Sequence, residues 1–110
     1  MSITIEKELV SVILATHNGT AYIEQSIDSV LSQSYAKFEL LIINDASTDA
    51  TEEIVLAIGD VRIRYIANEK RLGLTTSLNK GVSLARGEYI ARIDDDDVWW
   101  WVNGSGGPRC

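Results

Sequence analysis

The sequence predicts an α/β protein in which helices cover both faces of a parallel sheet of about four strands. Three observations lead to this prediction. Short apolar runs rich in β-branched residues alternate with segments whose apolar residues recur at helical spacing. Each of the first three apolar runs is followed by a helical segment, so the strands are joined by crossovers and run parallel. Polar turn residues follow the strands, as is usual at the carboxyl edge of such a sheet.

The four predicted strands are short. Residues 9–15 form a nearly continuous apolar run with several β-branched residues, which indicates a buried parallel strand. Residues 38–43 form a similar run that ends in a polar turn. Residues 62–67 alternate between two faces, and residues 89–93 form the last strand.

Three helices are predicted between these strands. They cover residues 21–34, 50–58 and about 72–85. Thr48 or Asp49 is suited to cap the second helix, because short polar side chains accept hydrogen bonds from the first free N–H groups. In the first helix the apolar residues that should face the sheet are Ile23, Ile27, Val30 and Leu31.

Length and composition allow one ordinary globular domain. The chain has 110 residues, of which 45% are hydrophobic and 24% are charged. Its net charge of −6 disfavours nucleic acid as a partner. The only cysteine is Cys110 and the only histidine is His17, so neither an internal disulfide nor a zinc site is expected.

The sequence predicts neither secretion by the classical route nor a membrane span. The N-terminus lacks the pattern of a signal peptide, and no apolar stretch is long enough to cross a membrane. We therefore expect no transmembrane segment and a cytoplasmic location, which includes peripheral association with the inner face of the membrane. Residues 1–99 form the predicted domain. Residues 100–110 are expected to be an irregular tail, which resembles a cloning remnant or a shifted reading frame more than a domain ending.

An acidic cluster follows the last predicted strand. Four adjacent aspartates repel one another, and a bound divalent cation is a favourable way to hold several of them together. The alternative is a solvated acidic turn, since runs of charge are usually exposed. Polar clusters also follow the first and second strands, and all three should meet at one edge of the sheet. These clusters are Thr16, His17 and Asn18; Asn44 and Asp45; and Asp94, Asp95, Asp96 and Asp97.

Several other kinds of site are excluded by their missing motifs. The turn at residues 16–20 lacks the G-x-G-x-x-G of dinucleotide-binding folds, and the chain contains no G-K-[ST] phosphate loop. The same turn is neither glycine-rich nor basic, as the corresponding loop of a nucleotidyltransferase would be. The aspartates lack the glycine and distal glutamate of an EF-hand. His17 has neither a cysteine partner nor a G-x-S-x-G serine, so a hydrolytic triad is poorly supported.

Four sequence blocks stand out in order along the chain. They are residues 10–18; residues 29–35 with 38–49; residues 68–74 with 77–81; and residues 87–97, which contain a D-x-D motif. In their order and spacing, over about residues 9–99, these blocks resemble family 2 glycosyltransferases, which have the GT-A fold. The resemblance implies a three-layer, Rossmann-like sheet that makes up part of a GT-A fold.

The resemblance implies a nucleotide-diphosphate sugar as the donor, most often linked to UDP. Thr16, His17 and Asn18 would then lie along the nucleotide, and Asp45 would contact the base, usually uracil. Asp95 would lie beside the ribose, and Asn79 is a further candidate for substrate binding. The bland alternatives are that Asp45 caps a turn with Ser47, and that His17 and Asn79 are ordinary polar residues.

The same resemblance implies a metal cofactor, Mn²⁺ or Mg²⁺, bound by Asp94 and Asp96. The cation would neutralise the charge that develops on the leaving diphosphate. In the family, an acceptor domain and a catalytic carboxylate follow the D-x-D block, and here the resemblance ends near residue 99. We therefore expect the donor-binding half of an inverting enzyme, truncated before its catalytic base.

The expected acceptor of the full-length enzyme is a glycan or a lipid-linked sugar, in cell-envelope polysaccharide biosynthesis. Two alternatives remain open. The chain could be a nucleotide- and metal-binding module without turnover, or a structural α/β fragment that binds neither.

Overall fold

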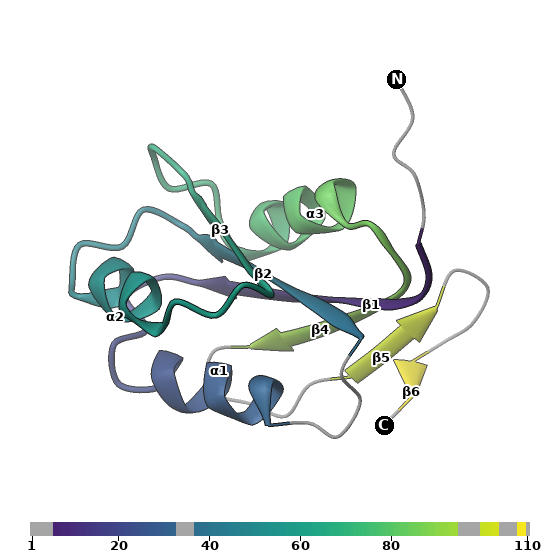
Figure 1. Cartoon of the computed structure of the whole chain (residues 1–110). Coiled ribbons are helices and arrows are strands. Elements are labelled where there is room, and N and C mark those ends of the chain that lie inside the picture. The colour runs from purple at the N-terminus through teal and green to yellow at the C-terminus, as the bar shows by residue number, and fades with distance from the viewer. Residues whose placement is uncertain (1–5, 33–36, 95–99, 104–107, 110) are drawn as a thin grey trace.

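A computed structural model describes residues 6–32, 37–94, 100–103 and 108–109 of the chain, with side chains described for residues 9–32 and 37–93. Strands and helices alternate from β1 to β4, and two short strands follow (Figure 1). The elements are β1 (Glu6–Thr16), α1 (Ile23–Leu31), β2 (Phe38–Asn44), α2 (Thr51–Ile58), β3 (Ile63–Ala67), α3 (Leu74–Leu84), β4 (Gly87–Asp94), β5 (Trp100–Asn103) and β6 (Pro108–Arg109).

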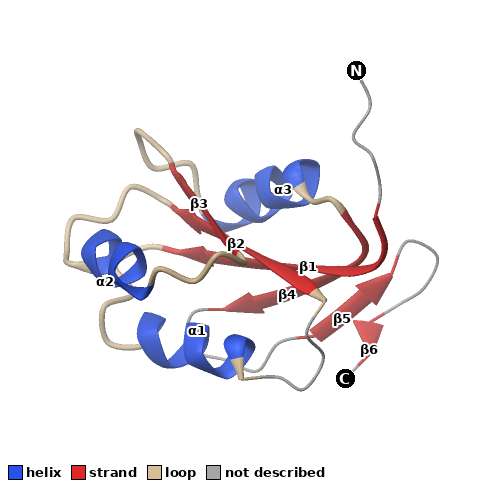
Figure 2. Cartoon of the chain, in the orientation of Figure 1, coloured by secondary structure: helices blue, strands red, loops and turns tan. Residues whose placement is uncertain are grey.

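The described strands form one sheet in the order β3-β2-β1-β4-β5-β6. The first four of these run parallel, with β1 between β2 and β4. The helices α1 and α2 lie on one face of the sheet and α3 lies on the other, which gives three layers (Figure 2). The predicted α/β, Rossmann-like parallel sheet of about four strands is thereby confirmed.

The core explains why these segments became buried strands. Every residue of β2 is buried, as expected for a parallel strand covered on both faces. On the face of α1 and α2, the side chains of Ile23, Ile27 and Val30 meet the sheet. A smaller apolar cluster, which includes Ile13 and Ile43, lies under α3. Burial of each such side chain is worth roughly 1.5–3 kcal/mol.

The boundaries of the elements differ from the predicted ones by a few residues. The second helix begins at Thr51, so Ala50 occupies the N-cap position and Asp49 lies one residue before it. Asp49 still accepts a hydrogen bond from the N–H of Thr51 at 3.0 Å, as a capping side chain does. The first helix ends at Leu31, and the predicted residues 33 and 34 lie outside the described residues.

Residues 100–103 and 108–109 form strands, although the sequence predicted an irregular tail over residues 100–110. The strand β5 pairs antiparallel with β4, where Ala91 is opposite Trp101, and β6 pairs antiparallel with β5. The backbone of β5 forms hydrogen bonds with the edge of β4, and no local feature of the sequence predicts such pairing. The β-rich Trp-Trp-Val sequence of β5 is compatible with this pairing.

None of the helices in the described part of the chain is long and apolar enough to span a bilayer. The longest of them, α3, has 11 residues.

Candidate functional site

The carboxyl ends of four strands meet along one edge of the sheet. Thr16, at the end of β1, is paired with Asn44 at the end of β2, which is paired in turn with Ala67 at the end of β3. On the other side of β1, the backbone of Asp94 is paired with Ala15. The chain leaves β1 toward β2 and β3 on one side and returns to β4 on the other. This reversal next to β1 is the position where open α/β sheets bind ligands.

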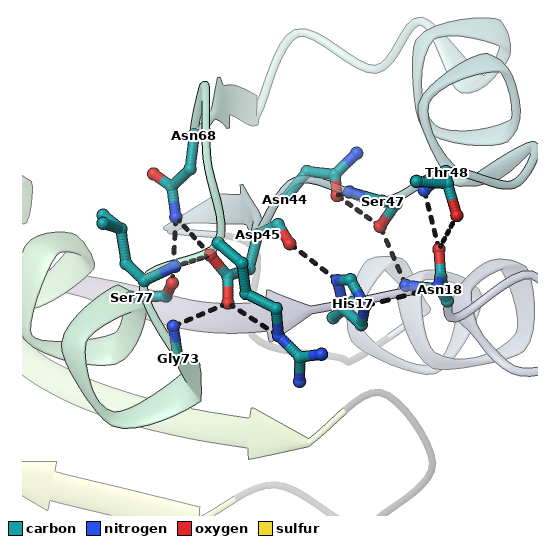
Figure 3. Close-up of polar contacts among 11 residues, drawn as sticks. His17, Asn18, Asn44, Asp45, Ser47, Thr48, Asn68, Gly73 and Ser77 are labelled. Carbon is teal, nitrogen blue, oxygen red and sulfur yellow. Dashed lines mark hydrogen bonds and ion pairs between the residues drawn. The ribbon is translucent and has the colours of Figure 1, made fainter.

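Asp45 lies directly after β2 at this edge, and its side chain is fully buried. Its Oδ1 accepts hydrogen bonds from Nδ2 of Asn68 at 2.9 Å and from the N–H of Leu72 at 2.8 Å. Its Oδ2 accepts one from the N–H of Gly73 at 2.9 Å (Figure 3). Gly73 has φ = 95°, a conformation that residues with a Cβ rarely adopt, so the glycine allows its N–H to face the carboxylate.

The hydrogen bonds keep the Asp45 carboxylate ionised despite its burial. Burial by itself raises the pKa of this carboxyl group. The N–H of Leu72, the amide of Asn68, the N–H of Gly73 and the charge of Arg71 all act in the opposite direction. Their combined effect places the pKa of Asp45 below its ordinary value, so the site holds a permanent negative charge at neutral pH.

Arg71 is the only charged side chain that forms an ion pair with Asp45 among the described residues. Its Nε lies 3.8 Å from Oδ2 of Asp45, and its own side chain is 61% exposed. An exposed pair at this distance contributes little to stability. Arg71 therefore partly covers the carboxylate and is only loosely held there.

His17 joins the end of β1 to the end of β2. Its Nδ1 lies 2.7 Å from the backbone oxygen of Asp45. Because a carbonyl oxygen can only accept, Nδ1 carries the proton and donates it. In the neutral ring, Nε2 is then free to accept the hydrogen bond from Nδ2 of Asn18 at 3.2 Å. The histidine ring is thus oriented from both of its nitrogens.

Asn18 connects the loop after β1 to the loop after β2. Its Oδ1 accepts a hydrogen bond from the N–H of Thr48 at 2.7 Å, and its own N–H donates to Oγ of Ser47 at 2.8 Å (Figure 3). Asn18 has φ = 53°, which asparagine tolerates better than most residues. These bonds fix the two loops against each other.

A second connection holds the same two loops closer to the helices. The N–H of Thr20 donates to Oδ2 of Asp49 at 3.3 Å, and the N–H of Gly19 donates to Oγ1 of Thr51 at 3.1 Å. Burial by itself raises the pKa of Asp49. The hydrogen bonds from Thr20 and Thr51 outweigh this effect and lower the pKa to about 2. Asp49 is therefore a structural carboxylate that ties the loop before α1 to the first residue of α2.

Asn68 lies behind Asp45, directly after β3. Its Nδ2 donates both to Asp45 and to Oγ of Ser77 at 3.0 Å. Its Oδ1 accepts a hydrogen bond from Nζ of Lys80 at 2.8 Å. Ser77 and Lys80 are three residues apart on α3, so they present their side chains on the same side of that helix.

The structure brings some of the predicted site residues together and separates others. Thr16 is fully buried, and its backbone oxygen accepts a hydrogen bond from the N–H of Asp45 at 2.7 Å. Thr16, His17, Asn18 and Asp45 therefore form one connected group. Asn79 is exposed on α3 and takes no part in the described hydrogen bonds around Asp45.

The predicted metal ligands are only partly described. The backbone of Asp94 ends β4 at the edge where Asp45 lies, whereas Asp95 and Asp96 lie outside the described residues. Among the described residues no three His, Cys, Asp or Glu side chains could hold a metal ion together. The chemistry of the D-x-D segment nonetheless suits Mn²⁺ or Mg²⁺, since both prefer carboxylate oxygens.

Asn68, Ser77 and Lys80 join the site in the structure, although no role was expected for them from the sequence. A signal for Asn68 was present, because it directly follows β3 just as Asp45 directly follows β2. The contributions of Leu72 and Gly73 come from backbone N–H groups, which carry no signal except the glycine itself. Ser77 and Lys80 could have been found only with the position of α3 known.

A parallel sheet of Rossmann-like order with a buried carboxylate at its switch point is typical of open α/β proteins that bind a ligand at this edge. Comparison with known families assigns the chain more specifically. Residues 11–99 match the glycosyl transferase family 2 profile, and the chain belongs to this family.

Curated relatives agree with this assignment. A glycosyltransferase of Haemophilus influenzae without an assigned reaction is 44% identical over 82% of this chain and 28% of its own length. The UDP-Glc:alpha-D-GlcNAc-diphosphoundecaprenol beta-1,3-glucosyltransferase WfgD of Escherichia coli is 42% identical over 83% of this chain and 36% of its own. The chain thus spans about a third of the length of these relatives.

Solved structures share the fold. TarS (residues 1–349) of Staphylococcus aureus superposes with a TM-score of 0.74 and 29% identity, over 80% of this chain and 27% of TarS. The mannosyltransferase PcManGT of Pyrobaculum calidifontis, in complex with GDP-Man and Mn²⁺, superposes with a TM-score of 0.73 and 30% identity. That superposition covers 79% of this chain and 27% of the mannosyltransferase. The GT-A fold that the sequence predicted is the fold of these neighbours.

Proposed function

We propose that this chain binds a nucleotide-diphosphate sugar and a divalent cation, and that it is the donor-binding part of an inverting glycosyltransferase. The observation that carries the proposal is the ionised, buried carboxylate of Asp45 at the switch point of the sheet. Solved neighbours are complexes with UDP, with UDP-GlcNAc, and with GDP-Man and Mn²⁺, which supports a nucleotide at this position.

The chemistry of Asp45 suggests which bases the site would accept. An ionised carboxylate offers about four acceptor positions, and the described hydrogen bonds occupy three of them. The remaining position is on Oδ2, beside the loosely held Arg71. It can accept an N–H from the base once Arg71 moves aside. Uracil and guanine carry such a ring N–H on their pairing edge, whereas cytosine and adenine present a bare ring nitrogen there.

The remaining site residues have supporting roles in this proposal. His17 and Asn18 hold the loop that would lie along the nucleotide, and Thr16 holds Asp45 through its backbone. Asp95 is proposed to contact the ribose. Asn79, which is exposed on α3, remains a weaker candidate for substrate binding.

Asp94 and Asp96 are proposed to hold the metal at the end of β4. When bound, Mn²⁺ or Mg²⁺ would neutralise the diphosphate in an otherwise acidic protein. In the absence of the cation the carboxylates would repel the donor.

The acceptor and the catalytic base are proposed to belong to the rest of a longer enzyme. An inverting transfer needs a carboxylate near the acceptor hydroxyl, and we assign none of the described residues to this role. The acceptor is proposed to be a glycan or a lipid-linked sugar of the cell envelope, met at the inner face of the membrane. The name of WfgD, with its diphosphoundecaprenol-linked acceptor, supports this part of the proposal.

Calorimetry of the 110-residue chain with nucleotides and Mn²⁺ tests the proposal. UDP and GDP should bind in the presence of Mn²⁺, and CDP and ADP should bind at least tenfold more weakly, because one lost hydrogen bond to a charged group costs about 1.5–3 kcal/mol. Absence of binding by all four to a folded sample would reject the nucleotide site. Equal binding by all four would reject the role of Asp45 in reading the base.

Turnover tests whether this chain carries a catalytic base of its own. We expect no sugar transfer and no accelerated hydrolysis of UDP-sugars by this chain alone. Transfer to an added acceptor would show that the chain carries its own catalytic base, contrary to the proposal. A dedicated nucleotide-binding module would also bind without turnover. Sugar transfer that appears when this chain is joined to the remaining part of a full-length relative would exclude that alternative.

A further inference from the structure

Lys80 on α3 is linked to the Asp45 carboxylate by two hydrogen bonds that share the side-chain amide of Asn68. Nζ of Lys80 donates to Oδ1 of Asn68 at 2.8 Å, and Nδ2 of Asn68 donates to Oδ1 of Asp45 at 2.9 Å. Asn68 is buried and Lys80 is half-buried. The three side chains come from α3, from the turn after β3 and from the end of β2, so they join three elements in one line of hydrogen bonds.

The polarity of this line is fixed from both ends. An ionised carboxylate can only accept hydrogen bonds, and an ammonium group can only donate them. The amide of Asn68 must therefore turn its NH₂ toward Asp45 and its oxygen toward Lys80. If Lys80 were absent, the amide would be held from one end only, and its oxygen would lose the charged donor that opposes a rotation of the side chain. Hydrogen bonds that involve an ion are also about twice as strong as neutral ones, which makes this arrangement sensitive to the loss of Lys80.

Asn68 also anchors, through its backbone, the segment that holds Asp45. Its backbone N–H donates to the oxygen of Asn44 at 2.8 Å, and it opens the segment whose N–H groups at Leu72 and Gly73 hold Asp45. Rotation of the Asn68 side chain would thus loosen one of the three bonds that leave Oδ2 of Asp45 as the free acceptor. Lys80 is in position to prevent this rotation.

We propose that Lys80 is a positioning residue of the nucleotide site, which sets the Asn68 amide and thereby presents Asp45 to the base. The inference deepens the proposed function and rests on it. Lys80 touches neither the base nor the diphosphate in this proposal. It acts through Asn68, which donates to Oδ1 of Asp45, whereas the exposed Arg71 lies near Oδ2.

The effect of Lys80 on Asp45 has to be distinguished from the effects of the other charged groups around this carboxylate. Arg71 faces the carboxylate from the segment before α3, and His17 contacts the backbone of Asp45 from the loop after β1. Both remain unchanged when only position 80 is altered. Lys37 is an exposed lysine next to the first residue of β2, at the opposite end of that strand from Asp45. Lys37→Met therefore removes the same charge without touching the line of hydrogen bonds.

The first experiment compares the binding of UDP and of uridine, each in the presence of the diamagnetic Mg²⁺, by NMR titration. Lys80→Met should raise the Kd of both ligands by about tenfold, as expected for loss of a charge-assisted hydrogen bond. Lys80→Arg should restore most of the affinity, and Lys37→Met should leave it unchanged. A loss confined to UDP would overturn the proposal, because it would mean that Lys80 attracts the diphosphate. Wild-type affinity in Lys80→Met would overturn it as well.

The second experiment needs no ligand and therefore remains decisive if the nucleotide proposal fails. The Asp45 carboxyl group is titrated by NMR in the free protein, after the amide spectrum has shown that each variant is folded. Lys80→Met should raise the pKa of Asp45, since it removes a partner that holds the donor in place. In an Asn68→Ala background the same change should have a much smaller effect, as double-mutant cycles show for coupled residues. Equal effects in both backgrounds would mean simple attraction through space and would overturn the inference.

Failure of the two proposals can be told apart. If the wild-type chain binds neither UDP nor GDP, the proposed function is wrong, and the titration still tests whether Lys80 orients Asn68. If the wild type binds and Lys80→Met binds equally well, the proposed function stands and the positioning role is wrong.

Discussion

Two residues in the loops of the site have left-handed backbone conformations, and they differ in how well they suit them. Asn18 has φ = 53° and Ala46 has φ = 56°. Asparagine tolerates this region, whereas alanine is strained there by roughly 1–2 kcal/mol because its Cβ approaches the following carbonyl. The strain at Ala46 is offset by the hydrogen bonds that fix its neighbours Asp45 and Ser47.

Ala46→Gly should therefore stabilise the protein. Glycine relieves the strain but adds freedom to the unfolded chain, so the net gain should be about 0.5–1 kcal/mol. Urea unfolding at neutral pH measures it. Ala57→Gly is the matched control, because Ala57 is exposed within α2, where glycine should cost about 1 kcal/mol. A loss of stability in both variants would contradict the assigned strain at Ala46.

Asp49 makes the fold sensitive to acid. Its pKa is about 2 in the folded protein, below the ordinary value of 3.8. A depressed pKa means that the ionised carboxylate stabilises the fold above pH 4, and that this contribution is lost as the pH falls from about 4 to about 2. Asp49→Asn keeps an oxygen that can accept from Thr51 but removes the titration.

The free energy of unfolding of Asp49→Asn should accordingly fall less than that of the wild type between pH 4 and pH 2. Asp45 and Asp60 also have lowered pKa values, so part of the wild-type slope should remain. Urea unfolding at several pH values checks this, and the exposed Asp28 on α1 provides a control as Asp28→Asn. Parallel curves for wild type and Asp49→Asn would contradict the role of Asp49.

The residues of the site were predictable from sequence only in part. The rule that polar groups after parallel strands converge at one edge pointed to Asp45 and to the loop of His17, and in the structure these two are hydrogen-bonded. The same rule would have pointed to Asn68. It could not have pointed to Lys80, because a lysine on a helix has the appearance of solvated surface until the packing of that helix is known.

At the scale of the elements, α3 packs closely against the sheet because of one glycine. A Cβ at Gly81 would overlap Cγ2 of Ile13, and it would also lie 3.5 Å from Cγ1 of Ile43. The absence of a side chain lets α3 approach β1 and β2, and this approach also brings Ser77 and Lys80 of α3 to Asn68. Close packing of α3 is thus a condition of the site's geometry.

Gly81→Ala should destabilise the protein by about 1–3 kcal/mol through overpacking, although alanine has the higher helix propensity. Thermal and urea unfolding measure the loss. In an Ile13→Ala background the overlapping Cγ2 is absent, and Gly81→Ala should then be neutral or stabilising relative to Ile13→Ala alone. The same cost in both backgrounds would mean that the overlap with Ile13 is not the cause.

The strands and helices up to β4 could be predicted because their signals are local. Apolar runs, helical spacing and polar turns identified β2 to within one residue and α2 to within one residue. The strand β5 was missed because its signal is not local. Its backbone groups pair with β4, and only the position of that strand at the edge of the parallel sheet makes such pairing available.

At the scale of the whole molecule, the two edges of the sheet serve different purposes. The carboxyl edge carries the charged group that we assign to the ligand, Asp45. The opposite edge carries a second buried carboxylate, Glu39, whose partners are all structural. Its Oε2 accepts from Oγ of Ser11 at 2.6 Å and from the N–H of Arg86 at 2.8 Å, and its Oε1 accepts from Nη1 of Arg64 at 2.9 Å.

Glu39→Ala should therefore separate stability from binding. The change leaves the hydroxyl of Ser11 and the N–H of Arg86 without their acceptor, and leaves the partly buried Arg64 without its ion-pair partner. Loss of one partner of such a network costs about 3–5 kcal/mol, and we expect a loss near the lower end because Arg64 keeps its hydrogen bond to the oxygen of Leu84. Urea unfolding measures this cost.

In the fraction that remains folded, the Kd for UDP with Mn²⁺ should equal that of the wild type, since Glu39 lies near the start of β2 and Asp45 directly after its end. A matched change at the other edge, Asp45→Ala, should weaken UDP binding in the folded fraction as well. If Glu39→Ala weakened nucleotide binding as strongly as Asp45→Ala, the two edges would be coupled through the sheet, and the assignment of binding to the carboxyl edge alone would be wrong.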